Sequence, residues 1–510
     1  MSRYFNFVQT FIFIAIFSNA ICQNEDRQWY FHASPNAILM DFNFDTIRVV
    51  EKNHYLNDFA LSPSNICDSN GQLQFLTNNY NIYDSAFALV TNNSEIDDYT
   101  APLTIGGMSF LDFPNSNIVV CIRTKFEEKG PFPPYTDNYI QSKVYLSYID
   151  KYANGGKGKL IEDKKLITII DDTLNLPVGA CRHANGRDWW VVVRKFRSNI
   201  FYLVLVTPLG YSVKQEFIGP SLPLVYGQGG KAMFSNDGKT FVFGVSLGNS
   251  FDVPPWYFDV FDFDRCNGRL SNQRNVNISD PFAARVQGVA ISPNNRFLYV
   301  SLTRKLYQYD LWSSNLDSSA VFIDTSASNT FMGDIKLAPN GKMYISALWL
   351  SQYLSSIEFP DSAGISCGFR RNSIDLGNPN IANYYFPNLP CFTLGADTTA
   401  FGCDTISTVG LDIINDVKSN IILFPNPVKE TLYISFEQTN SQLDKVSHAI
   451  IYDEIGSVLL RQDFNVNENR FDFEDMFSID VNSLNSGIYF INFLNKNNKV
   501  IATSKFIKAE

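Results

Sequence analysis

The sequence predicts an all-β protein: a β-propeller of about seven blades, with six to eight possible, followed by an Ig-like β-sandwich. Three observations predict it. Of the 510 residues, 15% are aromatic and only 18% charged, and aromatic side chains pack well on pleated sheets. A turn-strand-strand unit ending in an acidic residue recurs at intervals typical of propeller blades. Residues 421–510 then change to short hydrophobic runs broken regularly by turn residues, as in a sandwich.

Composition excludes several classes of protein. Hydrophobic residues make up 45% of the chain, which is enough for large cores and excludes global disorder. The formal net charge is 41 − 51 = −10. A nucleic-acid partner is therefore not expected, because binding a phosphate backbone needs a clustered basic face.

Residues 1–23 are predicted to be a secretory signal peptide. Arg3 gives a short positive start, Phe11–Phe17 is an unbroken apolar run, and small residues up to Ala20 precede a polar stretch. Cleavage after Ala20 or after Cys22 fits the pattern. A lipoprotein cysteine at Cys22 fits less well, because Ile21 is bulky. A membrane anchor would need about 20 apolar residues.

Residues 24–405 contain the recurring units. Four turns, at 68–72, 235–239, 292–296 and 338–342, combine Pro, Asn, Asp and Gly and each precede a strand rich in aromatic or β-branched residues. The last three start 57 and 46 residues apart, a period that fits blades. The strands at 144–150, 257–264 and 306–311 alternate in polarity, which predicts one buried face. A pair of β-sandwiches is the alternative.

Eight cysteines are present, and seven remain if Cys22 leaves with the signal peptide. Export permits disulfides. We expect a pair between Cys391 and Cys403, which bracket a short loop, with Cys367–Cys391 as the rival. Unpaired, buried cysteines are the other possibility. Without a CxxC pair, a zinc ribbon or redox motif is unsupported. Residues 406–420 are predicted to be a linker.

Residues 421–510 contain four boxes in order: LFPNPVKE at 423–430, IYDEIGSV at 451–458, IDVNSLNSGIYF at 479–490 and KFIK at 505–508. In these boxes the segment resembles the type A C-terminal sorting domain of the type IX secretion system, which exports proteins across the outer membrane of Bacteroidota. The residues that carry the match are Pro425, Asn426, Pro427, Asp453, Gly456, Leu484, Gly487, Tyr489, Lys505 and Lys508. Both glycines are expected at turn positions with positive φ.

This resemblance implies recognition by the outer-membrane translocon and its sortase-like machinery. Attachment to the cell surface through lipopolysaccharide, or release into the medium, would follow. Residues 60–395 also resemble a common class of secreted Bacteroidota proteins, most clearly in HANGRDWW at 183–190 and FDRCNG at 263–268. These relatives are largely uncharacterised, so the resemblance bears on architecture and export rather than on activity.

One polar and aromatic cluster is a candidate binding site, consisting of His183, Asn185, Arg187, Asp188, Trp189 and Trp190. Arginine is a forked donor, and tryptophan can stack on a sugar or a cation. The alternative is structural. In that case an Arg187–Asp188 pair ties a blade corner, and the two tryptophans point to opposite faces of a strand.

Other sequence patterns give weaker evidence of a catalytic or metal site. The G-x-S-x-G at 244–248 is followed by Pro254 and Pro255, which exclude the helix that a nucleophile elbow needs. Asp259, Asp262 and Asp264 suggest a calcium loop, but Cys266 occupies a ligand position. The four histidines have no metal-ligand spacing. No metal, cofactor or catalytic residue is therefore predicted.

The leading functional hypothesis is an exported binding protein for a glycan or protein, at the cell surface or released. One alternative is an enzyme that degrades extracellular polysaccharide or peptide, with central carboxylates and Arg187 or His183 as acid–base partners. Another is a structural adhesin or gliding component. An enzyme predicts a deep central pocket with two acidic groups, whereas a binder predicts a flat aromatic patch.

Overall fold

The computed structural model describes residues 24–33, 36–44, 46–52, 64–77, 81–90, 109–128, 140–196, 198–220, 229–246, 256–278, 286–325, 331–348, 351–377, 385–397, 403, 421–436, 446–453, 458–464, 477–495 and 500–509. The predicted signal peptide, its Cys22 and the predicted linker lie outside these residues. The chain divides into two compact units, Met1–Ser407 and Thr408–Glu510. In the described part, no helix is both long and apolar enough to cross a membrane.

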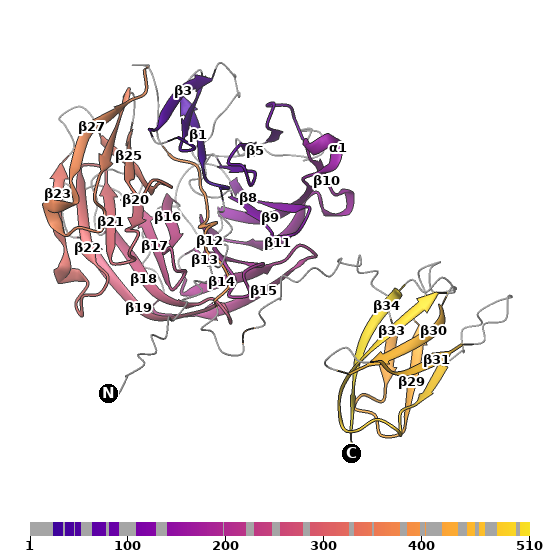
Figure 1. Cartoon of the computed structure of the whole chain (residues 1–510). Helices are drawn as coiled ribbons and strands as arrows, with labels where there is room; N and C mark the ends of the chain where they lie inside the picture. The colour runs from indigo at the N-terminus through magenta and orange to yellow at the C-terminus, as the bar shows by residue number, and fades with distance from the viewer. Residues whose placement is uncertain are drawn as a thin grey trace, which may run out of the picture. The chain divides into compact units, whose positions relative to one another are not determined.

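The first unit contains seven antiparallel sheets among its described residues, arranged as a ring of blades (Figure 1). Blade 1 is β1 (Gln28–Ala33), β2 (Asn36–Asp41) and β3 (Arg48–Lys52), and blade 2 is β4 (Ser64–Cys67), β5 (Leu73–Thr77) and β6 (Ile82–Asp84). Blade 3 is β7 (Ser109–Asp112), β8 (Ile118–Glu128) and β9 (Ile140–Asp150), to which β10 (Lys159–Leu160) and β11 (Ile167–Asp172) are added.

The other four blades have four strands each. Blade 4 is β12 (Leu174–Arg182), β13 (Trp189–Lys195), β14 (Ile200–Val206) and β15 (Tyr211–Phe217); blade 5 is β16 (Gly229–Phe234), β17 (Thr240–Ser246), β18 (Trp256–Asp264) and β19 (Arg269–Ile278). Blade 6 is β20 (Val286–Ile291), β21 (Phe297–Leu302), β22 (Lys305–Asp310) and β23 (Val321–Thr325); blade 7 is β24 (Phe331–Leu337), β25 (Met343–Leu348), β26 (Tyr353–Ile357) and β27 (Phe369–Asp375). The predicted propeller of about seven blades is confirmed.

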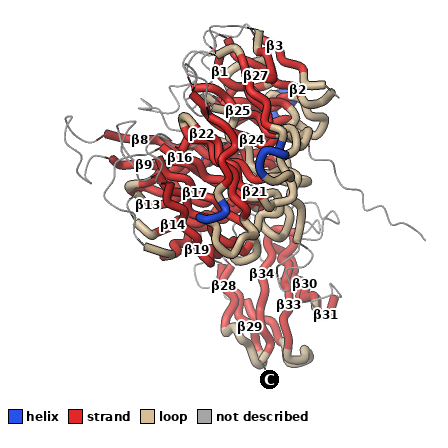
Figure 2. The backbone as a smooth tube through the Cα atoms, turned by 90° about the vertical axis from the view of Figure 1, so that its left-hand side faces the viewer, coloured by secondary structure: helices blue, strands red, loops and turns tan. Residues whose placement is uncertain are grey.

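Helical structure in the described residues is confined to four short segments, which Figure 2 shows among the strands. They are α1 (Ala153–Gly156), η2 (Glu162–Lys164), η3 (Asp317–Ser319) and η4 (Gly364–Cys367).

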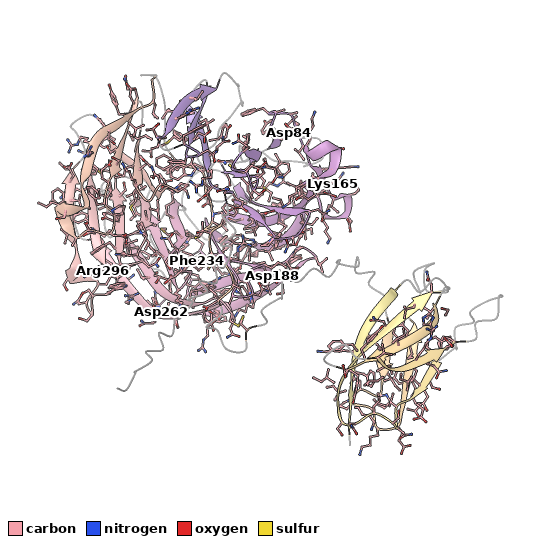
Figure 3. All side chains as sticks on the ribbon, viewed as in Figure 1. Asp84, Lys165, Asp188, Phe234, Asp262 and Arg296 are labelled. Atoms are coloured by element: carbon pink, nitrogen blue, oxygen red, sulfur yellow. A yellow bond between two sulfur atoms is a disulfide. The ribbon has the colours of Figure 1, made fainter. Side chains whose placement is uncertain are left out.

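Neighbouring blades pack face to face around the ring. Side chains fill the spaces between them, with Phe234 near the centre and Arg296 towards the outside (Figure 3). Because blades cover both faces of a strand, β13 and β21 are buried along almost their whole length. The predicted alternation is therefore wrong for residues 257–264, of which residues 257–261 are all buried. It holds better for β22, which alternates partly.

In the described part of the ring, each sheet consists of strands that are consecutive in the sequence, and none takes a strand from another blade. Blade 1 packs directly on blade 7. Trp29 and Phe31 of β1 share one core with Tyr344 of β25 and Leu354 of β26. Packing of the first blade on the last therefore has to hold the circle together.

The four predicted turns form as expected, each between the first and second strands of a blade. Their fourth residues, Gly71, Gly238, Asn295 and Gly341, all have positive φ, between +62° and +79°. In each turn the fourth residue donates its backbone N–H to the carbonyl of the first, at 2.9 Å in all four. Asn and Gly are the residues that adopt this conformation most readily, which explains the repeat.

After blade 7 the chain enters the centre of the ring, and we call the described residues 385–397 and Cys403 the tail (Figure 1). Phe386 packs on Trp29 and Phe31 of blade 1, and its N–H donates to Asp334 of blade 7. Asn388 bonds blade 2 through the Ser64 hydroxyl and blade 4 through the Val178 carbonyl. A segment that touches blades on all sides of the ring must run along its axis.

A disulfide holds the end of the tail. Cys403 is bonded to Cys266, which follows β18, with 5.5 Å between their Cα atoms. The predicted Cys391–Cys403 pair is therefore wrong, and so is Cys367–Cys391, because both Cys367 and Cys391 are free. Sequence proximity misled the prediction, since the passage of the tail through the ring places Cys403 beside a loop of blade 5.

The second unit is a sandwich of two described sheets. One contains β28 (Ile421–Phe424), β29 (Thr431–Phe436) and β32 (Phe477–Asp480). The other has the order β31 (Val458–Asp463), β30 (Val446–Tyr452), β33 (Gly487–Asn495) and β34 (Val500–Lys508). Leu432, Ile451, Ile491 and Phe506, each fully buried, lie in the core between them.

The fold brings the first and last sequence boxes of this unit together. The Asn426 side chain accepts a hydrogen bond from the Ile507 N–H at 2.8 Å, and Val428 forms a parallel bridge with Lys508. The peptide bonds preceding Pro425 and Pro427 are both cis. Boxes that stand some 80 residues apart in the sequence therefore form one continuous surface.

The remaining box residues have mostly packing roles. Tyr489 donates its hydroxyl to the Asn485 carbonyl at 2.7 Å and stacks on Phe506. Gly487 does not have the predicted positive φ, because it begins β33 and pairs with Lys508 as an extended residue. A Cβ there would lie 3.7 Å from the Tyr489 ring. Leu484 is buried. Lys505 lies in β34, where it pairs with Phe490 of β33. Gly456 lies outside the described residues.

Candidate functional site

The predicted binding cluster forms a compact corner at residues 183–190, between β12 and β13. Arg187 and Asp188 form a two-pronged ion pair, with N–O distances of 2.7 and 3.0 Å. Asn185 donates its side-chain amide to Asp188 at 2.8 Å and accepts the backbone N–H groups of Arg187 and Asp188. These polar groups satisfy one another, so the cluster ties the corner.

The corner is the blade 4 version of the recurring turn. Gly186 has φ +78° and donates its N–H to the His183 carbonyl, as Gly238 does to Ser235 in blade 5. His183 thus stands where the other turns have Ser, Ala or Asp. The sequence reasoning missed this equivalence because residues 183–187 lack the Pro or Ser–Asn pattern of the other copies.

The two tryptophans of the corner clamp blade 4 to its neighbours. Trp189 donates its indole N–H to the Asp112 carbonyl of blade 3 at 2.7 Å, and Trp190 donates to the Arg265 carbonyl beside blade 5 at 2.8 Å. They therefore point to opposite sides of β13. Because Trp189 is 0% and Trp190 6% exposed, neither offers an open face on which a sugar could stack.

His183 is held as a neutral ring. Its Nδ1 accepts the Asn185 N–H at 3.0 Å, which leaves Nε2 to donate to the Cys266 carbonyl at 2.9 Å. Burial, the largest cause, lowers the pKa of His183. The imidazole is therefore committed to holding the corner against the disulfide loop.

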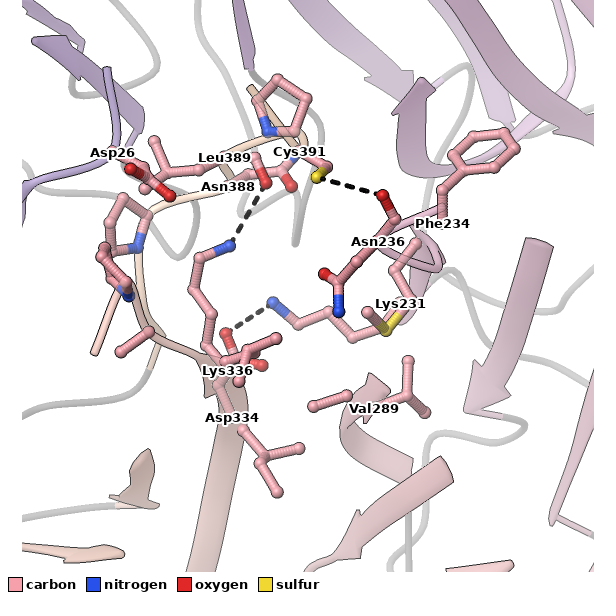
Figure 4. A pocket seen from close by; sticks show the side chains of 18 of the residues that line it. Asp26, Lys231, Phe234, Asn236, Val289, Asp334, Lys336, Asn388, Leu389 and Cys391 are labelled. Carbon is pink, nitrogen blue, oxygen red and sulfur yellow. Dashed lines mark hydrogen bonds and ion pairs between the residues drawn. The ribbon is translucent and has the colours of Figure 1, made fainter. Parts of the chain in front are cut away.

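A cavity of about 400 Å³ lies in the centre of the ring, and we call it the central cavity (Figure 4). The inner strands of blades 5, 6 and 7 form one side, and residues 387–391 of the tail form the other. Asp26, which precedes β1, also lines it, as do Ser109 of blade 3 and Ala180 of blade 4. The volume lies within the range of small-molecule sites.

Two lysines extend into the central cavity (Figure 4). Lys231 of β16 forms an ion pair with Asp334 of β24 at 2.8 Å. Lys336, two residues further along β24, donates one hydrogen bond, at 3.3 Å, to the Leu389 carbonyl. Asp334 also accepts the Phe386 N–H of the tail at 3.2 Å. Because successive β24 side chains alternate across the strand, residues 334 and 336 share one face.

The charges in the cavity are perturbed by burial. Burial, the largest cause, lowers the pKa of Lys336 to about 8, while Asp334 opposes that change. Burial also raises the pKa of Asp26, with Lys336 opposing it. Taking a charge out of water disfavours its ionised form. Opposite charges in the cavity therefore offset only part of the cost of burying Lys336 and Asp26.

The other candidate carboxylates have separate partners. Asp259 forms a buried pair with Arg194 at 2.6 Å, Asp262 accepts from Asn272, and Asp264 accepts from the Cys266 N–H. In the described part of the chain, no three His, Cys, Asp or Glu side chains are grouped as ligands for a metal ion. Gly244 lies within β17 and Ser246 is the last residue of that strand, while residues 247–255, where a nucleophile elbow would turn into its helix, lie outside the described residues.

Comparison with known protein families gives one match. Residues 422–509 match the family described as the secretion system C-terminal sorting domain. This range coincides with the second unit of the structure, in which the four sequence boxes are assembled. No curated protein matches the chain.

Several solved structures are similar to this chain at low sequence identity. A protein of unknown function from Desulfotomaculum acetoxidans DSM 771 is 13% identical, with a TM-score of 0.38, over 71% of this chain and 99% of its own. A quinonprotein alcohol dehydrogenase-like protein from Bacteroides thetaiotaomicron is 12% identical, with a TM-score of 0.38, over 71% and 78%. PorZ, a surface component of the type IX secretion system of Porphyromonas gingivalis, is 9% identical, with a TM-score of 0.26, over 95% and 80%.

The fold and the family match lead to one conclusion about destination. The chain joins a seven-bladed β-propeller to a C-terminal sorting domain of the type IX secretion system, which marks proteins for export to the cell surface or the extracellular space.

Proposed function

We propose that this exported protein is a binding protein whose ligand site is the central cavity rather than the corner at 183–190. The observation that carries the proposal is the cavity itself: about 400 Å³, with charged and apolar walls, held open by a tail that a disulfide anchors. A rigid scaffold with a preformed pocket suits recognition. The corner has no comparable opening, because its aromatic rings are buried.

Binding accounts for the cavity better than hydrolysis does. Two carboxylates line it, as the enzyme hypothesis predicted, but Asp334 already accepts from Lys231 and from the Phe386 N–H. Both bonds are made by Oδ2 and hold the carboxylate between blade 5 and the tail. Fixed donors and acceptors around a closed space are suited to holding a ligand.

A binding screen with the secreted form of the protein tests this proposal. The protein is exposed to a glycan array and to a small-molecule library, with thermal shift as the readout. Met233→Trp, which fills part of the cavity, is expected to abolish binding of each hit, while Arg187→Ala at the corner leaves it unchanged. The reverse pattern would move the site to the corner. Absence of any hit would contradict a binding function.

The export signal makes a separate prediction. Removing residues 421–510 is expected to leave the propeller in the periplasm, because the translocon no longer recognises it. Fractionation with an antibody to the propeller measures this, with the full chain as control. Delivery of the truncated protein to the surface would show that sorting information lies elsewhere. Attachment through lipopolysaccharide predicts a slowly migrating, modified band for the surface form, whereas release predicts free protein in the medium.

A further inference from the structure

Two ammonium groups in the central cavity have donors to spare. An ammonium group has three donors, and the only hydrogen bond that Lys336 makes among the described residues is the one to Leu389. Lys231 also points into the cavity and donates one hydrogen bond to Asp334. Of the two carboxylates that line the cavity, Asp334 is therefore the one to which a lysine is hydrogen-bonded among the described residues.

Two further polar groups that line the cavity have no hydrogen-bond partner among the residues that the structure describes. The indole N–H of Trp29 and the hydroxyl of Ser109 are buried without a hydrogen bond, and their residues are each only 1% exposed. Buried polar groups are nearly always hydrogen-bonded, so two such groups without a partner at the wall of a cavity indicate that a ligand occupies the cavity. Since an indole N–H donates only, that occupant must bring acceptors.

Asp26 is the second carboxyl group that lines the cavity. Burial, the largest cause, raises its pKa, while Lys336 opposes that change. Burial, the largest cause, also lowers the pKa of Lys336 to about 8, although Asp334 and Asp26 both oppose the change. A further anion placed beside Lys336 would favour its ammonium form.

Apolar groups complete the wall. Val289 of β20, Met233 of β16 and Pro387 of the tail line the same space. The occupant therefore has an apolar or ring-shaped body as well as an anionic end. At about 400 Å³ the space suits a small molecule rather than a polymer chain.

We propose that the central cavity binds a small organic acid, whose carboxylate is held by Lys336 and Lys231 while its body packs against the apolar wall. This inference rests on the proposed binding function and specifies its ligand class. The carboxylate would complete the donors of Lys336 and extend the existing Lys231–Asp334 pair into a network. Charge-assisted hydrogen bonds of this kind are stronger than neutral ones.

Matched pairs of probes test the inference on the secreted protein. D-glucuronate is compared with D-glucose, and a panel of aliphatic and aromatic carboxylates with their amides, by calorimetry and thermal shift. Glucose 6-phosphate and inorganic phosphate test for anions of another type. We expect at least one carboxylate to bind while its neutral counterpart binds about 10-fold or more weakly, in keeping with hydrogen bonds to charged groups.

Three variants identify the lysine. Lys336→Met is expected to weaken the carboxylate hit about 10-fold or more, and Lys336→Arg, which keeps the charge, to restore much of the affinity. Lys239→Met, in the exposed turn after β16, changes the net charge equally and is expected to have no effect. The melting temperature of each variant shows that it is folded, and removing a poorly compensated charge should not lower that temperature.

The outcomes separate the two proposals. If neutral sugars bind and the Met233→Trp variant loses that binding, the binding function would be supported, but the organic-acid inference would be overturned. Preference for phosphate esters over every carboxylate would also overturn it, as would unchanged affinity in Lys336→Met. If neither the array nor the panel yields a ligand, both proposals fail.

Discussion

The Cys266–Cys403 disulfide is expected to be a large single contribution to propeller stability. The Cys403→Ser variant lacks this cross-link, which joins two residues that are 137 positions apart in the sequence. For that separation, the chain-entropy relation gives a loss of about 5 kcal/mol. Measured losses for native disulfides run from about 2 to 5 kcal/mol, and we expect a value in this range. The tail contacts at residues 385–397 remain in the variant, which limits the damage to the end of the tail.

Urea unfolding followed by tryptophan fluorescence measures the effect, because Trp190 lies in the corner that the disulfide loop contacts. Cys266→Ser should match Cys403→Ser, and the double variant should lose no more than either. Cys391→Ser is the control, since that thiol is free, and its cost should stay below about 1 kcal/mol. If Cys391→Ser costs as much as Cys403→Ser, or if alkylation finds Cys266 free, the disulfide assignment is refuted.

Two further predictions concern buried charges. Burial raises the pKa of Glu25 to about 7, so its folded form favours the proton, and stability falls as pH rises from 4.5 to about 7. Glu25→Gln should therefore raise the unfolding free energy by about 3 kcal/mol at pH 8 and by nothing below pH 4.5, as denaturation at the two pH values will show. Asp259→Ala strands the fully buried Arg194 and should cost about 3 to 5 kcal/mol, whereas Arg194→Met with Asp259→Leu should cost much less in the same assay.

The sequence was most informative where local chemistry decides the structure. Turns with Gly71, Gly238, Asn295 and Gly341 were found because positive φ restricts the residue type strongly. The corner at 183–190 belongs to the same series, but only Gly186 carries the signal there. The residues predicted as a binding site form a turn and two tryptophans that hold blade 4 to its neighbours. No local sequence pattern records this, because the burial of these residues depends on the neighbouring blades.

The cavity and the disulfide could not be predicted for the same physical reason. Both depend on the tail, which has no repeat and follows the axis of the ring after blade 7. That path brings Leu389 to Lys336 and Cys403 to Cys266. Asp26 and Lys336 come from the two ends of the propeller, so only ring closure makes them neighbours. Contacts at such separations leave no periodicity in a sequence.

Ring closure and ligand binding should therefore be linked. Blades 1 and 7 meet through a shared apolar core and through the contact of Lys336 with the Trp29 ring, and the central cavity lies where Asp26, β24 and the tail come together. A ligand held by Lys336 and Lys231 would connect blade 7 to blade 5 and lie against the tail, adding contacts at the junction that no shared strand secures. Binding to the closed ring alone stabilises it in proportion to the logarithm of ligand concentration. Burial disfavours the charge of Lys336 in the empty ring, and a bound anion would offset that cost, so the same lysine would contribute to the stability of the occupied ring.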